Sequence, residues 1–231
     1  AKYLSQDYAV PQVVWARYAF HMLVLTLYLR GRVLPTLRTR APRLQLLRSI
    51  TMVVTTGVFF LGLVFVPLAT ASAIMFVGPL LVTALSMPLL GEQVGPRRWA
   101  GVAFGFLGAL VIIRPGSDLF ELAALLPLGA ACGYALYQIM TRMVARTGEP
   151  PMTSLVYTAL LGAILTSLAV PFFWTAPDLE GWLLMALMGL CGGLGHFTLI
   201  QALDAAPAPA VTPFAYSSLV WATLLGLRVF G

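Results

Sequence analysis

The sequence predicts an all-α, polytopic membrane protein with eight visible transmembrane helices. An ordinary soluble domain is excluded by composition, because 60% of the residues are hydrophobic and only 10% are charged, against about 25% charged residues in soluble domains. The apolar runs have the length of membrane-spanning helices, and a pattern in the first half recurs in the second half at a constant offset of 140 residues. Five runs contain no Asp, Glu, Lys or Arg: 49–91, 122–141, 150–177, 181–203 and 205–227.

The first expected helix, 11–29, is followed by an arginine-rich loop and then by the 43-residue charge-free run 49–91. A single helix of that length would measure about 65 Å, which is twice the hydrocarbon thickness of a bilayer. The run must therefore fold back. Pro67 marks the break, because proline ends one helix and readily starts the next. The resulting helices are expected at 46–65 and 68–90.

Proline, glycine and charged clusters punctuate the rest of the chain. The segment "GEQVGPRR" precedes an expected helix at 97–113, and "RPGSD", "RTGEPP", "TAPDLEG" and "DAAPAP" precede four more. Strands are not expected, because the apolar runs are too long, too uniform and too rich in Leu and Ala. The four later helices are expected at 119–143, 152–173, 181–203 and 208–230.

Basic residues gather on one face of the predicted bundle. Ten arginines lie in loops that alternate spans place on the same side, whereas the opposite loops carry only three basic residues. Cytoplasmic loops are enriched in Lys and Arg, so loops 30–48, 91–98 and 142–151 are expected to be cytoplasmic. The ten arginines are Arg30, Arg32, Arg38, Arg40, Arg43, Arg48, Arg97, Arg98, Arg142 and Arg146.

The repeat predicts the symmetry of the fold. Helix 68–90 is the third span and helix 208–230 the eighth, so the copies cross the membrane in opposite directions. Inverted repeats of this kind recur in secondary transporters. A complete five-helix unit would add one helix before Ala1 and one after Gly231, which predicts a ten-helix bundle with its first and last helices missing here. Aligned pairs include Lys2 and Arg142, Pro11 and Pro151, Pro67 and Pro207, Ser72 and Thr212, Phe76 and Tyr216, Thr83 and Thr223, Leu85 and Leu225, and Gly91 and Gly231.

In these motifs the chain resembles the drug/metabolite transporter superfamily, specifically its EamA-like branch with two five-helix units. The resemblance implies a first repeat at 1–116 and a second at 117–231. It also implies a secondary carrier of a small metabolite, such as an amino acid or an S-adenosylmethionine-like compound, in a bacterial inner membrane. The matching segments are "WARYAF" (15–20), "PLATASAIMFVGPLLVTALSMPLLGE" (67–92), "RRWAGVAFGFLGALVIIRPG" (97–116), "AACGYALYQIMTR" (130–142) and "APAPAVTPFAYSSLVWATLLGLRVFG" (206–231).

Ionisable residues inside apolar runs are the first candidates for substrate binding, because they are costly in a bilayer. Arg17 is expected either to snorkel toward headgroups or to contact a substrate carboxylate or phosphate. His21, one turn further on the same face, is either a hydrogen-bonded core residue or a proton relay. His196 lies among four glycines and either packs closely or lines the pathway. Gln201, further along that helix, is another candidate for a polar cavity contact.

A polar stripe marks another span. Tyr134, Gln138 and Thr141 share one helical face, and such a stripe is expected to face the interior and line a cavity. The repeat-related aromatics Phe76 and Tyr216 adjoin prolines, and broken helices near the midplane are where inverted-repeat carriers bind substrate. These residues are therefore added to the predicted substrate site. Glu92 is expected to form an interfacial ion pair or to anchor a helix end.

Several other functions find no support in the sequence. No Walker A segment, HExxH motif or aspartate cluster predicts an ATPase, a metalloprotease or another enzyme, and no cofactor or metal site is expected. Cys132 and Cys191 are expected to be small buried hydrophobic residues. The basic residues follow membrane topology, so no nucleic-acid partner is expected. Gly101, Gly105 and Gly108 are typical of close helix packing, within the bundle or in a homodimer. A non-transporting membrane subunit or a channel remains the alternative to a carrier.

Overall fold

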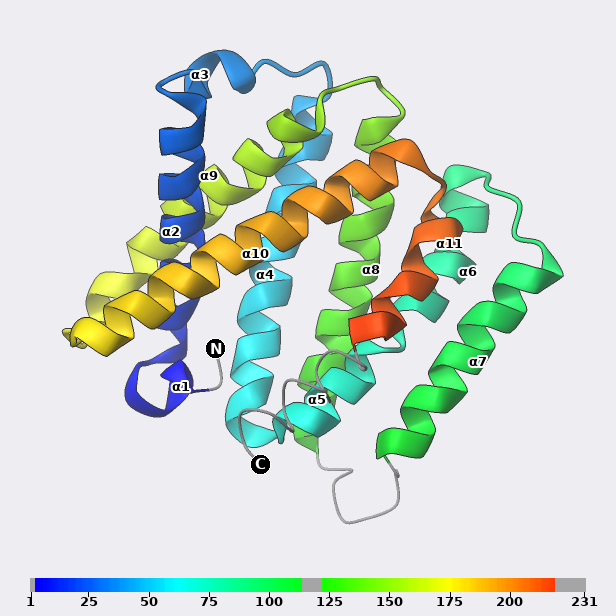
Figure 1. Cartoon of the computed structure of the whole chain (residues 1–231), viewed down its shortest axis with the longest axis horizontal. Helices are drawn as coiled ribbons and strands as arrows, with labels where there is room; N and C mark the ends of the chain where they lie inside the picture. The colour runs from blue at the N-terminus through cyan, green and yellow to red at the C-terminus, as the bar shows by residue number, and fades with distance from the viewer. Residues whose placement is uncertain (1–2, 114–121, 219–231) are drawn as a thin grey trace.

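The computed structural model describes residues 3–113 and 122–218, and every regular element in these ranges is a helix (Figure 1). The predicted boundary between the two repeats, at residues 116 and 117, lies outside the described residues, as does most of the expected helix 208–230. The α-helices are α1 (Leu4–Asp7), α2 (Val10–Leu29), α3 (Val33–Thr36), α4 (Pro42–Phe65), α5 (Leu68–Met75), α6 (Gly78–Leu90), α7 (Pro96–Ile113), α8 (Leu125–Ala145), α9 (Pro151–Ala169), α10 (Leu179–Ala205) and α11 (Ala208–Val211). Short 3₁₀ helices are η1 (Leu122–Ala124), η2 (Val170–Phe173) and η3 (Thr212–Tyr216).

Four helical segments of the described ranges are long and apolar enough to cross a membrane: Pro42–Phe65, Thr70–Leu90, Pro151–Phe173 and Leu179–Ala205. The all-α, multi-pass architecture expected from composition is therefore present. The number of eight spans within a ten-helix inverted repeat stays a prediction.

The bundle has an apolar core that also encloses many polar side chains, and it exposes many long apolar side chains. Helix α4 packs mainly against α8 and α9, and α2 packs mainly against α9 and α10. Long apolar side chains cover the outer surface, including Leu27, Leu168 and Leu183, which are all exposed. This distribution suits lipid, where outer helix faces meet hydrocarbon and polar groups must find partners inside the bundle. Cys132 and Cys191 lie on the exposed surface, so the expectation that they are buried is wrong.

Two prolines start new helices at equivalent points of the repeat. Pro67 precedes α5 with φ −55° and ψ 145°, and Pro207 precedes α11 with φ −56° and ψ 143°. In both places a proline with extended ψ ends the preceding segment and pre-sets φ for the next helix. The break predicted at Pro67 is confirmed by this geometry.

The expected helix 68–90 is interrupted, because α5 ends at Met75 and α6 begins at Gly78. At the break, the N–H groups of Phe76 and Val77 bond to carbonyl oxygens three residues back, each at 3.0 Å. Pro79 follows at once and has no N–H to donate, so a regular α-helical ladder cannot continue through this point. The second copy is irregular at the same place, where η3 follows α11 and contains Pro213.

The arginine-rich connections meet at one end of the bundle. Figure 1 shows α3 and the connections α6–α7, α8–α9 and α10–α11 along the upper side, with α1 and the α4–α5 connection at the lower side. The first of the predicted loops is shorter than expected, because α4 begins at Pro42. Arg48 therefore lies inside α4 and is fully buried, which corrects its assignment to a loop. Which end faces the cytoplasm stays a prediction.

Candidate functional site

A cavity of about 370 Å³ lies beside the break between α5 and α6. Its walls come from α4, α5, α6 and α8, and from the irregular segment after α11. This volume falls within the range of small-molecule sites. The lining residues are Phe59, Ser72, Met75, Phe76, Pro79, Tyr134, Gln138, Thr212, Ala215 and Ser218.

Two walls of the cavity are built by residues that the sequence repeat aligns. Ser72 and Met75 of α5 line the cavity, and so do the residues 140 positions later, Thr212 and Ala215 of η3. The pair Phe76 and Tyr216 continues this relationship. Their rings stack with centroids 5.5 Å apart, and the Tyr216 hydroxyl donates to the Phe76 carbonyl oxygen at 3.0 Å. The two irregular segments therefore meet directly at the cavity.

Polar groups without a hydrogen-bond partner in the described part of the chain border this cavity. The Thr212 hydroxyl is buried without a hydrogen-bond partner among the described residues. Gln138 is 5% exposed, and its side-chain amide likewise has no protein partner in the described part of the chain. Buried polar groups are normally satisfied, so a hydroxyl and an amide left open at one cavity can serve a bound solute or water. Tyr134 completes this wall, as the polar stripe on its helix predicted.

Behind Tyr134, polar side chains from α2, α4, α8 and α10 connect. The Tyr134 ring stacks on Tyr137 with centroids 6.0 Å apart, and the Tyr137 hydroxyl lies 3.5 Å from Nδ1 of His196. Nε2 of the same histidine lies 2.6 Å from Nη2 of Arg17. Arg48 donates from Nη1 to the Tyr137 hydroxyl at 3.2 Å. Two predicted site residues, Arg17 and His196, are thus in direct contact.

The glycines of α10 bring this helix against α2. A Cβ placed on Gly189 would lie 2.4 Å from Cβ of Phe20 and 3.1 Å from the backbone nitrogen of His21. A Cβ on Gly193 would lie 2.7 Å from the His21 ring. The distances of 2.4 and 2.7 Å are shorter than real Cβ contacts, so these glycines permit close helix packing. His21 is buried in this contact, and its Nε2 has no partner among the described residues. Gln201 lies exposed on α10, away from the cavity.

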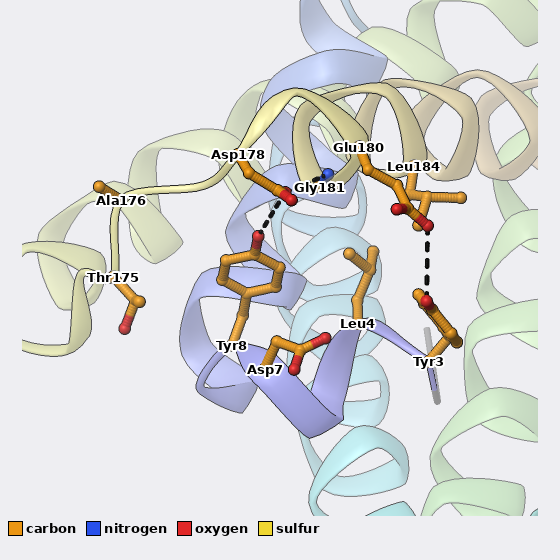
Figure 2. A pocket seen from close by; sticks show the side chains of 10 residues that line it. All are labelled: Tyr3, Leu4, Asp7, Tyr8, Thr175, Ala176, Asp178, Glu180, Gly181 and Leu184. Atoms are coloured by element: carbon orange, nitrogen blue, oxygen red, sulfur yellow. Dashed lines mark hydrogen bonds between the residues drawn. The ribbon is translucent and has the colours of Figure 1, made fainter.

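A second pocket, of about 380 Å³, lies where α1 meets the start of α10 (Figure 2). The Tyr8 hydroxyl donates to Asp178 Oδ1 at 3.1 Å, and the same oxygen accepts from the Gly181 N–H at 2.8 Å. Asp178 therefore caps α10 and also ties α1 to it. Desolvation and the bond to Asp178 raise the pKa of the Tyr8 phenol. These carboxylate contacts are structural.

At the arginine-rich end, one carboxylate joins several helix ends. Glu92 pairs with Arg142 at 3.1 Å and with Arg146 at 2.8 Å, and its Oε2 accepts from the Ala208 N–H at 3.1 Å. Arg142 also donates to the carbonyl oxygens of Leu203 and Asp204 at the end of α10, at 2.9 and 3.1 Å. The predicted ion-pair role of Glu92 is present, with arginines of α8 and its C-cap as partners.

Glu149 has a similar role at the start of α4. Its Oε1 accepts from the Thr39 hydroxyl and from the backbone N–H groups of Arg40 and Ala41, and its Oε2 accepts from Gln45 Nε2 at 2.8 Å. Desolvation alone would raise the pKa of this carboxyl group. The hydrogen bonds from residues 39–41 and Gln45 outweigh that effect and hold the pKa below its ordinary value.

Sequence reasoning missed the role of Arg48. The side chain is fully buried and donates to the Ser154 carbonyl oxygen, to Thr158 Oγ1 at 2.9 Å and to Thr141 Oγ1 at 3.2 Å. A signal was present, because polar residues recur on one face of α4 at helical spacing. The buried members of this stripe are Gln45, Arg48, Ser49, Thr55 and Thr56.

Comparison with known proteins identifies relatives of the whole chain. Residues 1–114 match the model of the EamA-like transporter family. The chain is 32% identical to a riboflavin transporter of Vibrio cholerae, over 100% of this chain and 79% of the relative. It is 30% identical to a riboflavin transporter of Rhizobium johnstonii, over 100% and 77%. It is 26% identical to an S-adenosylmethionine uptake transporter of Rickettsia bellii, over 100% and 78%.

A solved crystal structure shares the fold of this chain. The match has a TM-score of 0.78 and covers 95% of this chain and 79% of the other. The sequences are 22% identical, so this likeness shows the fold alone.

Proposed function

Because this chain belongs to the EamA-like transporter family and is a small-metabolite transporter, we propose that it works as a secondary carrier. Two inverted repeats, 1–116 and 117–231, alternate access to one site between them. The proposed location is a bacterial inner membrane, with the arginine-rich connections on the cytoplasmic side. The proposed substrates are small metabolites of the riboflavin or S-adenosylmethionine kind, since these are what the relatives' names state.

The observation that carries the proposal is the cavity between the two irregular segments. Repeat-related residues such as Ser72 and Thr212 line it together. In inverted-repeat carriers, the substrate site lies at the repeat interface and is formed by discontinuous helices. The interruption after Met75 and the 3₁₀ segment after Val211 supply such helices, and the cavity volume suits a small metabolite.

The proposed substrate contacts follow from the lining. Phe76 offers an aromatic surface at the cavity, and Tyr216 stacks on it from outside the lining. Tyr134 offers a further ring, and Gln138 offers a donor and an acceptor. Flat heteroaromatic groups stack well on such rings, and a buried amide fixes orientation through hydrogen bonds. His21 packs against α10 and Gln201 faces outward, so neither is included in the proposed contact set.

The test is substrate counterflow into proteoliposomes that contain the purified protein. Vesicles preloaded with unlabelled riboflavin or S-adenosylmethionine should accumulate the labelled compound transiently, as carriers do and channels do not. Replacing Gln138→Leu removes neutral hydrogen bonds worth about 0.5–1.5 kcal/mol each, so the apparent substrate affinity should fall by about 2–10-fold. The matched variant Gln93→Leu changes an exposed loop glutamine and should transport normally.

The alternative, a channel or a non-transporting subunit, predicts a different outcome. A channel would equilibrate label without transient accumulation, and a subunit would give no protein-dependent flux with either compound. Equal flux in the Gln138→Leu variant would remove this cavity from the transport pathway.

A further inference from the structure

Two arginines lie inside the bundle without a carboxylate partner in the described ranges. Arg48 is fully buried and Arg17 is half-buried, whereas both ion pairs of the described part belong to Glu92 at the arginine-rich end. A buried charge without a counter-charge carries a large desolvation cost. The described carboxylates all lie at helix ends or in connections, namely Asp7, Glu92, Glu149, Asp178, Glu180 and Asp204.

The positively charged guanidinium of Arg48 is buried where a solute cannot contact it. Its Nη atoms donate to neutral oxygens of Tyr137, Thr141 and α9, and its 0% exposure leaves no path for a solute to touch it. Hydrogen bonds to neutral oxygens hold the guanidinium in place but cancel none of its charge. Arg48 is therefore a fixed source of positive potential inside the bundle.

Arg17 differs, because most of its donors remain open. Only its Nη2 has a hydrogen-bond partner in the described part of the chain, and that partner is His196. Gly192 lies beside the guanidinium, and a Cβ added there would be in van der Waals contact with Arg17 Nε, at 3.4 Å. A guanidinium has further N–H groups in a planar fork that matches carboxylate and phosphate oxygens. Arg17 can therefore accept an anion without losing its present bond.

The contact with Arg17 also fixes the state of His196. A guanidinium only donates, so Nε2 of His196 must be the acceptor at 2.6 Å. The imidazole is then neutral, with its proton on Nδ1 facing the Tyr137 hydroxyl at 3.5 Å. His196 thus supplies no negative charge to offset Arg17 and instead orients it.

Side-chain contacts connect Arg17 to the cavity wall. Arg17 contacts His196, His196 faces the Tyr137 hydroxyl, and the Tyr137 ring stacks on Tyr134, which lines the cavity. The first turn of α6 borders the same cavity at Pro79. We propose that the transported metabolite bears an anionic group, a carboxylate or a phosphate, and that the Arg17 guanidinium, oriented by His196, binds this group. This assignment rests on the proposed carrier function and adds a substrate class to it.

The test uses pairs of probes that differ in one anionic group. Titration calorimetry on the purified protein compares flavin mononucleotide with riboflavin, and S-adenosylmethionine with its decarboxylated form. The first pair tests a phosphate and the second a carboxylate. A hydrogen bond to a charged group contributes about 1.5–3 kcal/mol, so the preferred anionic probe should bind at least about tenfold more tightly than its neutral-end partner. Inorganic phosphate and acetate, measured as changes in Tm, probe the anion site without any organic scaffold.

Three variants and one control variant make the result specific. Arg17→Gln should abolish the preference, and Arg17→Lys should retain part of it because the charge remains. Gly192→Leu keeps Arg17 but places a bulky side chain against its guanidinium, so it should also lose the preference even if Arg17→Gln folds poorly. Arg97→Gln removes the same charge from an exposed position and should behave as the unmodified protein.

The outcomes separate this inference from the carrier proposal. Equal affinities within both pairs, together with identical phosphate and acetate responses in Arg17→Gln and unmodified protein, overturn the anion site even if transport is observed. Anion-dependent stabilisation that is lost in Arg17→Gln supports the site even if neither organic pair binds. In that case the anion site stands, and the proposal that the substrate resembles riboflavin or S-adenosylmethionine fails.

Discussion

Replacement of Glu92 tests the arginine-rich end of the bundle, where one carboxylate holds three helix ends. The Glu92 side chain is 6% exposed, and its partners Arg142 and Arg146 are 16% and 42% exposed. The Arg146 pair is open to solvent and should contribute at most about 1 kcal/mol. The Arg142 pair is nearly buried, and breaking such a pair costs about 3–5 kcal/mol when the remaining charge stays unpaired.

Arg142 keeps two carbonyl partners at the end of α10 after the carboxylate is lost, so the lower part of this range applies. We therefore expect Glu92→Ala to lower stability by about 3–4 kcal/mol. For a domain of this size, that loss corresponds to a fall in Tm of about 5–15 °C. Glu92→Gln keeps an acceptor for the Ala208 N–H and should lose less.

Thermal unfolding in detergent micelles, followed by tryptophan fluorescence, measures this effect. Glu180→Gln is the matched control, because that carboxylate is exposed at the opposite end and makes one long contact, at 3.4 Å to the Tyr3 hydroxyl. Its effect should stay within about 0.5 kcal/mol. A double-mutant cycle of Glu92→Gln with Arg142→Gln isolates the pair. A Tm for Glu92→Ala equal to that of the unmodified protein would refute the reasoning.

Three further predictions concern other parts of the fold. The Glu149 carboxyl has a depressed pKa in the folded protein. Its contribution to the free energy of unfolding is therefore fully present above the pKa of the unfolded state, and it is lost as the pH falls through the pKa of the folded state. The Tm of Glu149→Gln should therefore lie below that of the unmodified protein at neutral pH and converge with it in acid. Gly189→Ala should destabilise by about 1–3 kcal/mol through overpacking against Phe20, whereas Gly195→Ala, with open space around its Cβ, should be neutral or stabilising in thermal unfolding. Arg48→Met should lower Tm by several degrees, because it leaves hydroxyls of α8 and α9 without their donor; an unchanged Tm would contradict this.

Much of the fold followed from composition and punctuation. Charge-free runs and prolines located the long helices, because a bilayer imposes a narrow range of helix lengths and proline cannot continue a hydrogen-bond ladder. The interruption at Phe76 and Val77 was less visible, since the run from Leu68 to Leu90 is uniformly apolar. The nearby Pro79 was its only local signal, and a proline in the first turn of a helix is compatible with several backbone paths.

The site was predicted in part. The polar face containing Tyr134 and Gln138 was readable, because a stripe at helical spacing on a spanning helix faces the interior. The contact between Arg17 and His196 was not readable, since 179 residues separate them and only the packing of α2 on the glycines of α10 brings them together. Arg48 was hidden for another reason. A lone arginine at the edge of a basic loop has the same sequence signature whether it turns outward or inward.

Alternating access around the cavity is the central claim, and two-sided labelling tests it most directly. Ser72→Cys and Thr212→Cys, each in a background with both native cysteines replaced by serine, place thiols at the cavity on α5 and on η3. A membrane-impermeant thiol reagent is added to one side of sealed vesicles or to the other. The account predicts that both thiols react from either side, that conditions which speed labelling from one side slow it from the other, and that a transported compound protects both. Labelling from both sides that rises and falls together would contradict a carrier and favour a channel. A failure of either thiol to react from any side would remove the cavity from the pathway.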